Sequence, residues 1–203
     1  MTGFTLLAAL VASAATGFHP AERTAVFSGG CYWGVESVFE HVRGVKSAVS
    51  GFAFADTTAP SPDGPALRGS YAEAVRVVYD PSQVSYEQLL DIFFLVAHDP
   101  TQQDRQGPDV GPQYRSVLFF EGDEQRVAAR TYLARLRAGG TYTAPIVTEL
   151  ATLRAFRPVE ESQQDYAARH PTELYILVND APKLEALRRR FPALYRREET
   201  ARR

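Results

Sequence analysis

Two sequence patterns meet in the stretch Gly29-Gly30-Cys31-Tyr32-Trp33-Gly34-Val35-Glu36. Before it, residues 24–27 form a short β-prone run that ends at the glycine pair. After it, apolar residues recur at i, i+3, i+4 and i+7, which predicts a helix with one apolar face. These residues are Val35, Val38, Phe39 and Val42. Cys31 is therefore expected at a strand-to-helix turn, where unpaired N–H groups and the helix dipole favour the thiolate, the nucleophilic form.

Cys31 is the only cysteine, and a lone cysteine is more often a buried small hydrophobe than a nucleophile. Three features of the stretch favour the nucleophile. The glycine pair lets backbone approach closely, the helix start favours the charged thiol, and Tyr32 and Trp33 can form an apolar pocket wall. On the predicted helix, Glu36 and Glu40 fall on the face opposite the apolar stripe.

The length of 203 residues fits one large domain, and a hydrophobic content of 45% is ordinary for a globular protein. The net charge of −2 argues against nucleic acid as a main partner. A single cysteine excludes an intramolecular disulfide. The four histidines are far apart in sequence, so no metal site is predicted.

Residues 1–20 differ in composition from residues 21–203, which we expect to form the domain. The uncharged apolar run 4–15 is too short to span a bilayer, so no membrane span is predicted. Ala12-Ser13-Ala14 fits the cleavage site of a secretory signal, although the charged residues that usually precede the apolar run are missing. We expect a signal peptide and an exported protein, periplasmic or extracellular. The alternative is a disordered or helical N-terminal extension on a cytoplasmic protein.

The rest of the chain alternates between β-prone and helical patterns. Strands are predicted at 45–54, 71–79, 115–120 and 146–156, and helices at 85–97, 123–138, 160–169 and 182–190. Residues 55–70 are rich in proline and glycine and are expected to form a loop, as is the polar segment 99–114. Residues 175–178 are a short apolar run. Because several β runs are adjacent, both an α+β and a mixed α/β arrangement fit.

Glu73 has an unusual position in the strand predicted at 71–79. Alternation along the strand places its side chain on the same face as Val75 and Val77, which should face the core. A carboxylate there is either a solvated strand end or a buried acid with a raised pKa. The pattern alone favours the solvated strand end.

Four blocks of the sequence resemble a known family. Gly30-Cys31-Tyr32-Trp33-Gly34 is similar to the glycine-cysteine-phenylalanine-tryptophan-glycine signature of type A peptide methionine sulfoxide reductases. Three further blocks, 72–81, 98–107 and 109–116, agree with the family in order and spacing. The likeness covers residue 24 to about residue 170. It implies an α+β fold, a mixed α/β roll in which one domain has a central mixed β-sheet flanked by helices.

The chain also departs from the family pattern. The tyrosine that usually precedes the acid strand is absent from residues 58–63, and a histidine two residues before the acid is replaced by Tyr71. Ser162-Gln163-Gln164 stands in place of a tyrosine-histidine-glutamine sequence. Many relatives carry C-terminal resolving cysteines, and this chain has none.

The resemblance implies an oxidative damage repair enzyme that reduces the S epimer of methionine sulfoxide, free or in proteins. Cys31 would attack the sulfoxide sulfur and become a sulfenic acid. Glu73 matches the family's acid and would protonate the departing oxygen. Tyr114 would donate a second hydrogen bond to that oxygen.

Three further residues would bind the substrate. Tyr32 and Trp33 would hold the S-methyl group in an apolar pocket, and Asp109 would orient the loop or the bound substrate. The expected partners are oxidised proteins, peptides or free methionine sulfoxide. The resemblance implies no bound cofactor. Because there is no second cysteine, an external thiol must restore Cys31: thioredoxin, glutaredoxin or a small thiol. We expect the protein to be a monomer.

Two other functions remain open at this level. A cysteine hydrolase would use Cys31 to attack a carbonyl and His98 as its base, although His98 at a predicted helix end before a proline is typical of a structural cap. A non-enzymatic protein could bind oxidised peptides after losing activity together with the loop tyrosine.

Overall fold

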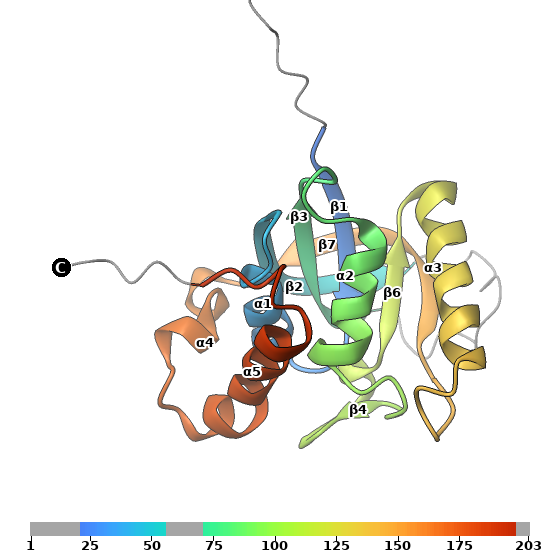
Figure 1. The fold of residues 1–203 in the computed structure, drawn as a ribbon. Coiled ribbons are helices and arrows are strands. Elements are labelled where there is room, and N and C mark those ends of the chain that lie inside the picture. Colours follow the sequence, from blue (N-terminus) through green and yellow to red (C-terminus); the bar gives the residue numbers. More distant parts are fainter. Residues whose placement is uncertain (1–20, 56–70, 198–203) are drawn as a thin grey trace, which may run out of the picture.

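Five strands close into a barrel in the computed structural model, which describes residues 21–55 and 71–197. Their order around the barrel is β1-β3-β2-β7-β6 (Figure 1). The β6–β7 pair is parallel and the other four pairs are antiparallel, so the predicted mixed sheet is confirmed. The strands are β1 (Arg23–Ser28), β2 (Val45–Ala55), β3 (Tyr71–Tyr79), β6 (Val117–Phe120) and β7 (Glu149–Pro158).

The two faces of the barrel wall carry side chains of different size. Small side chains line the inner cluster, among them Ala53, Ala72, Ala74 and Ala151. A barrel of so few strands has a narrow interior, which explains the alanines. The outer face carries larger residues, including Phe27, Val75 and Val77, which belong to the cluster that the helices cover. Glu73 shares this outer, helix-facing side with Val75, as the alternation in β3 predicts.

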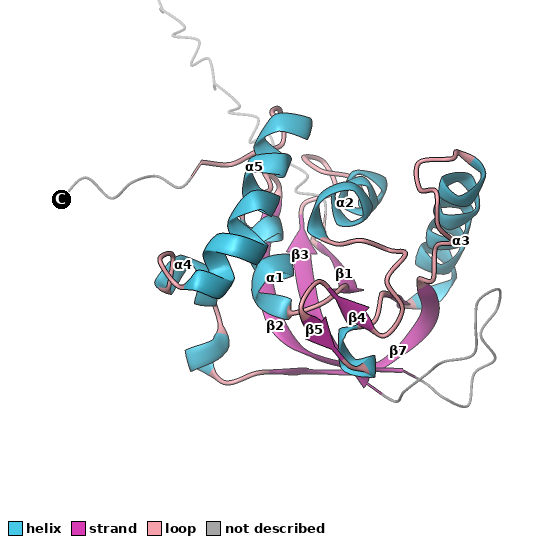
Figure 2. Ribbon diagram, turned by 90° about the horizontal axis from the view of Figure 1, so that it is seen from below, coloured by secondary structure: helices cyan, strands magenta, loops and turns pink. Residues whose placement is uncertain are grey.

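Helices pack around the barrel (Figures 1 and 2). Their bounds are α1 (Tyr32–Glu40), α2 (Tyr86–Ile92), α3 (Gly122–Ala138), α4 (Tyr166–Arg169) and α5 (Ala181–Arg190). α2 begins with a capping box between Ser85 and Gln88 and continues as a π-helical turn, Phe93–Ala97, so together they match the helix predicted at 85–97. A second π-helical turn, Ile176–Asp180, leads into α5 and includes most of the apolar run 175–178, for which the sequence predicted no element.

The segment 99–114, predicted as a polar loop, contains a small hairpin. Its strands are β4 (Arg105–Gln106) and β5 (Asp109–Val110), and a 3₁₀ turn, Pro112–Tyr114, follows. The helix predicted at 160–169 is likewise divided into a 3₁₀ turn, Glu161–Gln163, and α4. Asp165 interrupts it, because its backbone is left-handed, with φ at 50°.

Glu36 lies opposite the apolar stripe of α1, as expected, yet that face is buried as well. Glu36 is only 1% exposed and accepts hydrogen bonds from the backbone N–H groups of Ser50 and Asp165, each at 3.0 Å. Burial raises its pKa to about 7. The carboxyl group therefore ties α1 to β2 and to the turn before α4, a role that the position of Glu36 on the helix does not reveal.

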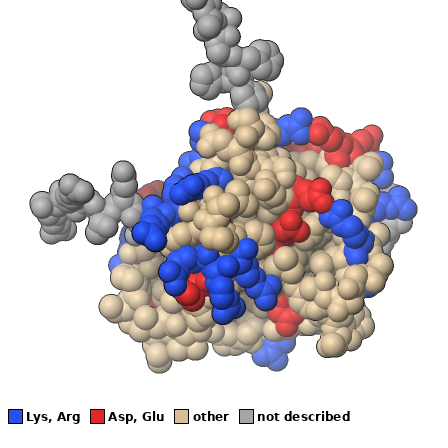
Figure 3. Space-filling model, in the orientation of Figure 1, with Lys and Arg blue, Asp and Glu red and all other residues tan. Residues whose placement is uncertain are grey.

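Several predicted features lie outside the described residues: the signal peptide within 1–20 and most of the loop 55–70. Within the described part of the chain, no helix is both long enough and apolar enough to cross a membrane. Figure 3 shows basic side chains gathered near α5, with acidic groups elsewhere on the same face. The last turn of α5 carries Arg188, Arg189 and Arg190, where positive charge interacts favourably with the helix dipole.

Candidate active site

Cys31 is the N-cap residue of α1, directly after the turn that follows β1. The turn needs Gly30, whose φ of 97° lies in a region that other residues rarely adopt. At Gly34 the constraint is steric and does not depend on φ. A Cβ atom there would lie 2.1 Å from Oδ1 of Asp180, which is 2% exposed and pairs with Lys183 at 3.1 Å. The segment before α5 thus packs directly against the first turn of α1.

Glu73 lies beside this turn. Its Oε2 accepts a hydrogen bond of 3.3 Å from the backbone N–H of Tyr32, the residue after Cys31. Burial raises the pKa of Glu73 to about 7, and the nearby charge of Asp109 acts in the same direction. Hydrogen bonds from the Tyr32 N–H and the Tyr114 hydroxyl oppose this rise. Glu73 is therefore a partly buried acid, in contrast to the solvated strand end that the pattern alone favoured.

The expectation of a thiolate at Cys31 is wrong for the structure as it stands. Burial raises the pKa of the thiol from 9.0 to about 12. The negative charges of Glu73, Asp180 and Asp109 add to the rise, and the hydrogen bond from the Trp33 N–H only partly offsets it. Desolvation and neighbouring carboxylates therefore outweigh the helix start, and the site holds a neutral thiol at neutral pH.

Tyr114 ends the 3₁₀ turn after β5, and Arg115 holds that turn in place. The Arg115 side chain is nearly buried and donates hydrogen bonds to the carbonyls of Pro112 at 2.8 Å and Tyr71 at 2.7 Å. Its Nε pairs with Glu149 at 3.1 Å. Tyr71 begins the strand that carries Glu73, so Arg115 sets the turn against that strand. Burial and the charge of Glu73 raise the pKa of Tyr114, which keeps its hydroxyl a hydrogen-bond donor.

Trp33 is held by aromatic contacts on several sides. Its indole stacks on the Tyr166 ring, with centroids 3.8 Å apart and planes at 8°. Tyr32 and Tyr175 meet it edge-on, at 6.3 Å and 5.8 Å between centroids. Tyr32 in turn meets Phe52 edge-on at 6.2 Å. These rings form an apolar wall beside Cys31.

Asp109, predicted to orient the loop or the substrate, accepts a hydrogen bond of 2.5 Å from the Tyr175 hydroxyl. The structure therefore brings all six predicted residues into one region around Cys31. It adds Tyr166, Tyr175 and Asp180, which the sequence analysis missed. No local sequence pattern identifies these three residues as part of the site. The run 175–178 is recognisable only as apolar, and both tyrosines are remote in sequence from Cys31.

His98 does not suit the role of a catalytic base. Its Nδ1 contacts the Phe93 carbonyl at 2.9 Å and its Nε2 contacts the Ser116 hydroxyl at 2.7 Å, so both ring nitrogens are occupied. Burial lowers its pKa to about 4. His98 therefore acts as a buried structural residue, which removes the observation that the hydrolase alternative needs.

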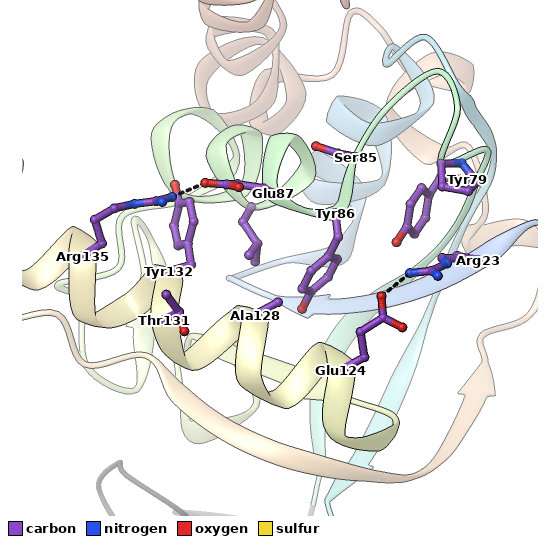
Figure 4. A pocket seen from close by; sticks show the side chains of 12 residues that line it. Arg23, Tyr79, Ser85, Tyr86, Glu87, Glu124, Ala128, Thr131, Tyr132 and Arg135 are labelled. Atoms are coloured by element: carbon purple, nitrogen blue, oxygen red, sulfur yellow. Dashed lines mark hydrogen bonds and ion pairs between the residues drawn. The ribbon is translucent and has the colours of Figure 1, made fainter.

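A cavity of about 430 Å³ lies away from this site, between α2 and α3 (Figure 4). Tyr79 and Tyr86 line it, and the ion pairs Arg23–Glu124 and Arg135–Glu87 flank it. It contains none of the predicted site residues. Within residues 21–55 and 71–197, no group of three or more histidine, cysteine, aspartate or glutamate side chains could hold a metal ion.

A family model described as peptide methionine sulfoxide reductase matches residues 23–194. The chain belongs to this family. Peptide methionine sulfoxide reductase MsrA 2 of Mesorhizobium japonicum is 47% identical over 178 residues, covering 87% of this chain and 91% of the relative. The corresponding enzyme of Synechocystis is 44% identical, covering 82% of this chain and 78% of its own. The chain is therefore an oxidoreductase, a methionine sulfoxide reductase.

The solved structures agree with this reductase fold. Methionine sulfoxide reductase A of Corynebacterium diphtheriae has a TM-score of 0.60 and 33% identity, covering 77% of this chain and 78% of that one. The fold is also shared by Mxr1 from Saccharomyces cerevisiae in complex with Trx2, with a TM-score of 0.52 and 22% identity. That match covers 72% of this chain and 85% of the other. The predicted family and the α+β fold class are confirmed.

Proposed function

We propose that this reductase reduces methionine S-sulfoxide, in proteins, in peptides and as the free amino acid, with Cys31 as its nucleophile. The observation that carries the proposal is the placement of the Glu73 carboxyl group against the Tyr32 N–H, beside Cys31 and the aromatic wall. Glu73 is the proton donor, Tyr114 is the second hydrogen-bond donor to the oxygen, and Trp33 packs on the S-methyl group.

In the proposed reaction, Cys31 supplies the two electrons that reduce the sulfoxide, and Glu73 transfers the proton. The Cys31 sulfur forms a bond to the sulfoxide oxygen in the net reaction, the substrate sulfur is reduced to a thioether, and Cys31 is oxidised to a sulfenic acid. Cys31 starts as a thiol, because burial raises its pKa to about 12. A carboxyl group with a pKa of about 7 can both accept the thiol proton and protonate the oxygen. Glu73 is the group that meets both requirements.

A single-turnover experiment tests this function. Wild-type protein receives the S or the R sulfoxide without reductant, and dimedone then traps any sulfenic acid for mass spectrometry. We expect a dimedone adduct on Cys31 and one methionine per protein from the S epimer only. Cys31→Ser should form neither, because its hydroxyl is a far weaker nucleophile. Turnover by the serine variant, or no adduct in the wild type, would contradict the reductase mechanism; the second result would favour a binder of oxidised peptides.

The reductant is an external thiol, because Cys31 is the only cysteine. A thioredoxin-like or glutaredoxin-like protein, or a small thiol, would attack the sulfenic acid and leave a mixed disulfide on Cys31. We propose that the protein acts as a monomer. Analytical ultracentrifugation of the reduced protein measures this directly, and a stable dimer would contradict it.

We also propose that the protein is exported, on the basis of the apolar run 4–15 and the small residues Ala12-Ser13-Ala14. The intact mass of the protein purified from its native host tests this. Export predicts a chain that has lost the apolar run. A cytoplasmic protein that retains residues 4–15 would refute export.

A further inference from the structure

Tyr175 connects two parts of the site that are far apart in sequence. Its ring meets the Trp33 indole edge-on, with planes at 85° and centroids 5.8 Å apart. Its hydroxyl donates a hydrogen bond to Oδ2 of Asp109 on the β4–β5 hairpin. Tyr166 also contacts Trp33, but its hydroxyl bonds to Glu173 on its own segment. Among the tyrosines that touch Trp33, Tyr175 is thus the one bonded to the hairpin.

We propose that Tyr175 and Asp109 form a latch that fixes Trp33 in the orientation required to bind the S-methyl group of the substrate. This inference rests on the proposed function, since it assigns the indole to the methyl pocket. Tyr175 is a positioning residue: it acts through Trp33 and performs no step of the reaction.

The hydrogen bond is suited to this role. A phenol that donates to a carboxylate forms a charge-assisted bond, which is about twice as strong as a bond between neutral groups. Burial, together with the negative charges around it, raises the pKa of Tyr175, so the hydroxyl keeps the proton that it donates. The amide of Asn179 donates to the Tyr175 carbonyl at 3.0 Å, which fixes the backbone from which the ring projects.

The segment that carries Tyr175 has few other anchors. Leu174 is 74% exposed and Val178 is 62% exposed, so these neighbours contribute little packing. Ile176 and Asp180 are its buried residues, and Asp180 packs against Gly34 in the first turn of α1. Without the bond to Asp109, the Tyr175 ring would be free to move away from the indole, and Trp33 would lose one of the two aromatic contacts, with Tyr166 and Tyr175, that the chain after β7 provides.

Trp33 is the only tryptophan, so its fluorescence reports on the latch directly. Tyr175→Phe keeps the ring and removes only the hydroxyl. We expect stronger acrylamide quenching of Trp33 in this variant, measured without substrate. In single turnover with the S sulfoxide, the apparent dissociation constant should rise on the order of 10-fold, the usual effect of losing a hydrogen bond to a charged group. The limiting rate should stay within a factor of about three, because Cys31, Glu73 and Tyr114 are unchanged.

Tyr132→Phe is the matched control. The Tyr132 hydroxyl also donates to an aspartate, Asp91, at 2.8 Å, but Tyr132 lines the cavity between α2 and α3 (Figure 4). This variant should change neither quenching nor the dissociation constant. If it does, general loosening of the fold explains the result for Tyr175→Phe, and the latch is refuted.

Asp109→Ala, which removes the acceptor, and the double variant complete a cycle. If the two residues act through one bond, their effects on the dissociation constant will be strongly non-additive, and the double variant will resemble Asp109→Ala. Additive effects, or unchanged quenching in Tyr175→Phe, would overturn the latch. A wild type that forms no sulfenic acid would instead overturn the proposed function, whatever the quenching data show.

Discussion

The site places two titratable side chains, Cys31 and Glu73, where burial penalises the charged form of each. For Cys31, a pKa rise from 9.0 to about 12 corresponds to about 4 kcal/mol against the thiolate. A helix N-terminus contributes at most about 2 kcal/mol in its favour. Desolvation therefore wins, and the thiol loses its proton only when something in the reaction takes it. Glu73, with a pKa of about 7, is the nearby group able to do so.

At this scale, Glu73→Gln tests the proton donor. Glutamine keeps the shape and can still accept the hydrogen bond from the Tyr32 N–H, but it cannot transfer a proton. General acid–base catalysis contributes about 10²–10⁴-fold, so the single-turnover rate should fall by about that factor. Rapid-quench measurement of methionine formation gives the rate. A rate within a factor of about three of the wild type would show that Glu73 is not the acid.

The residues of the site differ in how far the sequence reveals them. Cys31 could be placed because a lone thiol between a β-prone run and a helical stripe has few positions to occupy, and β alternation placed Glu73 on the helix-facing side. The burial of Glu73 could not be predicted, because it depends on how α1 packs over the end of β3. Tyr175 and Asp180 could not be found at all, because only tertiary packing brings the last third of the chain to α1.

At the scale of elements, Arg115 is the residue that joins several of them. It contacts the start of β3, the turn that carries Tyr114, and Glu149 at the start of β7. The exposed fractions of the Arg115 and Glu149 side chains are 3% and 2%, so both charges depend on their partners. Removing one member of such a pair leaves an uncompensated buried charge.

Arg115→Ala should therefore destabilise the fold by about 3–5 kcal/mol, measured from urea unfolding curves. Arg126→Ala is the control, because Arg126 forms an exposed pair with Asp123 inside α3 and should cost less than about 0.5 kcal/mol. Equal effects of the two substitutions would show that the buried pair has no special weight. In any folded Arg115 variant, single-turnover rates should fall as well, because the turn that carries Tyr114 has lost its anchor.

The same scale explains which elements the sequence predicts. Long strands and helices with clear periodicity, such as β3, α2 and α3, were placed correctly to within a few residues. The β4–β5 hairpin was not, because two-residue strands show no alternation. Closure of the barrel through the parallel β6–β7 pair was not predicted either, since pairing between remote strands leaves no local signal.

For the whole molecule, the buried carboxyls make stability depend on pH. In the folded protein the pKa of Glu36 rises from its ordinary 4.5 to about 7, and that of Glu73 does the same. At pH values between 4.5 and about 7, the folded state binds more protons than the unfolded chain, so the free energy of unfolding falls as pH rises. Each group contributes at most about 1.4 kcal/mol per pH unit in this window. The contribution is complete below about pH 4.5 and lost above about pH 7.

Urea unfolding from about pH 5 to about pH 8 should show this decline, and Glu36→Gln should have a shallower decline than the wild type. His98 opposes the decline below about pH 6.5, because burial lowers its pKa to about 4 and the unfolded chain then binds the extra proton. It does so equally in both proteins, so the difference between their slopes belongs to Glu36. An identical slope in Glu36→Gln would show that Glu36 titrates normally in the folded protein.

Recycling is also a property of the whole chain. With one cysteine, no internal disulfide can form, so the sulfenic acid persists until an external thiol reacts with it. After one turnover without reductant, mass spectrometry should show a gain of one oxygen on Cys31, and dithiothreitol should restore turnover. Added peroxide should convert the persistent sulfenic acid to the sulfinic form, and dithiothreitol should then no longer restore turnover. A Cys31–Cys31 disulfide between two copies as the main product would contradict this scheme.

The closed barrel has a consequence for how proteins can be recognised. Because β1, β3, β2, β7 and β6 pair in a ring, each has a neighbouring strand on both sides, and only short stretches, such as residues 45–50 of β2, are paired with a strand on one side alone. A polypeptide that docked by adding a strand, the mode in which backbone hydrogen bonds supply the affinity, would find only such short stretches to extend. We therefore expect the oxidised side chain, rather than the backbone around it, to make the contacts with the residues at the start of α1. Recognition of this kind would depend on one functional group and little on the sequence that surrounds it.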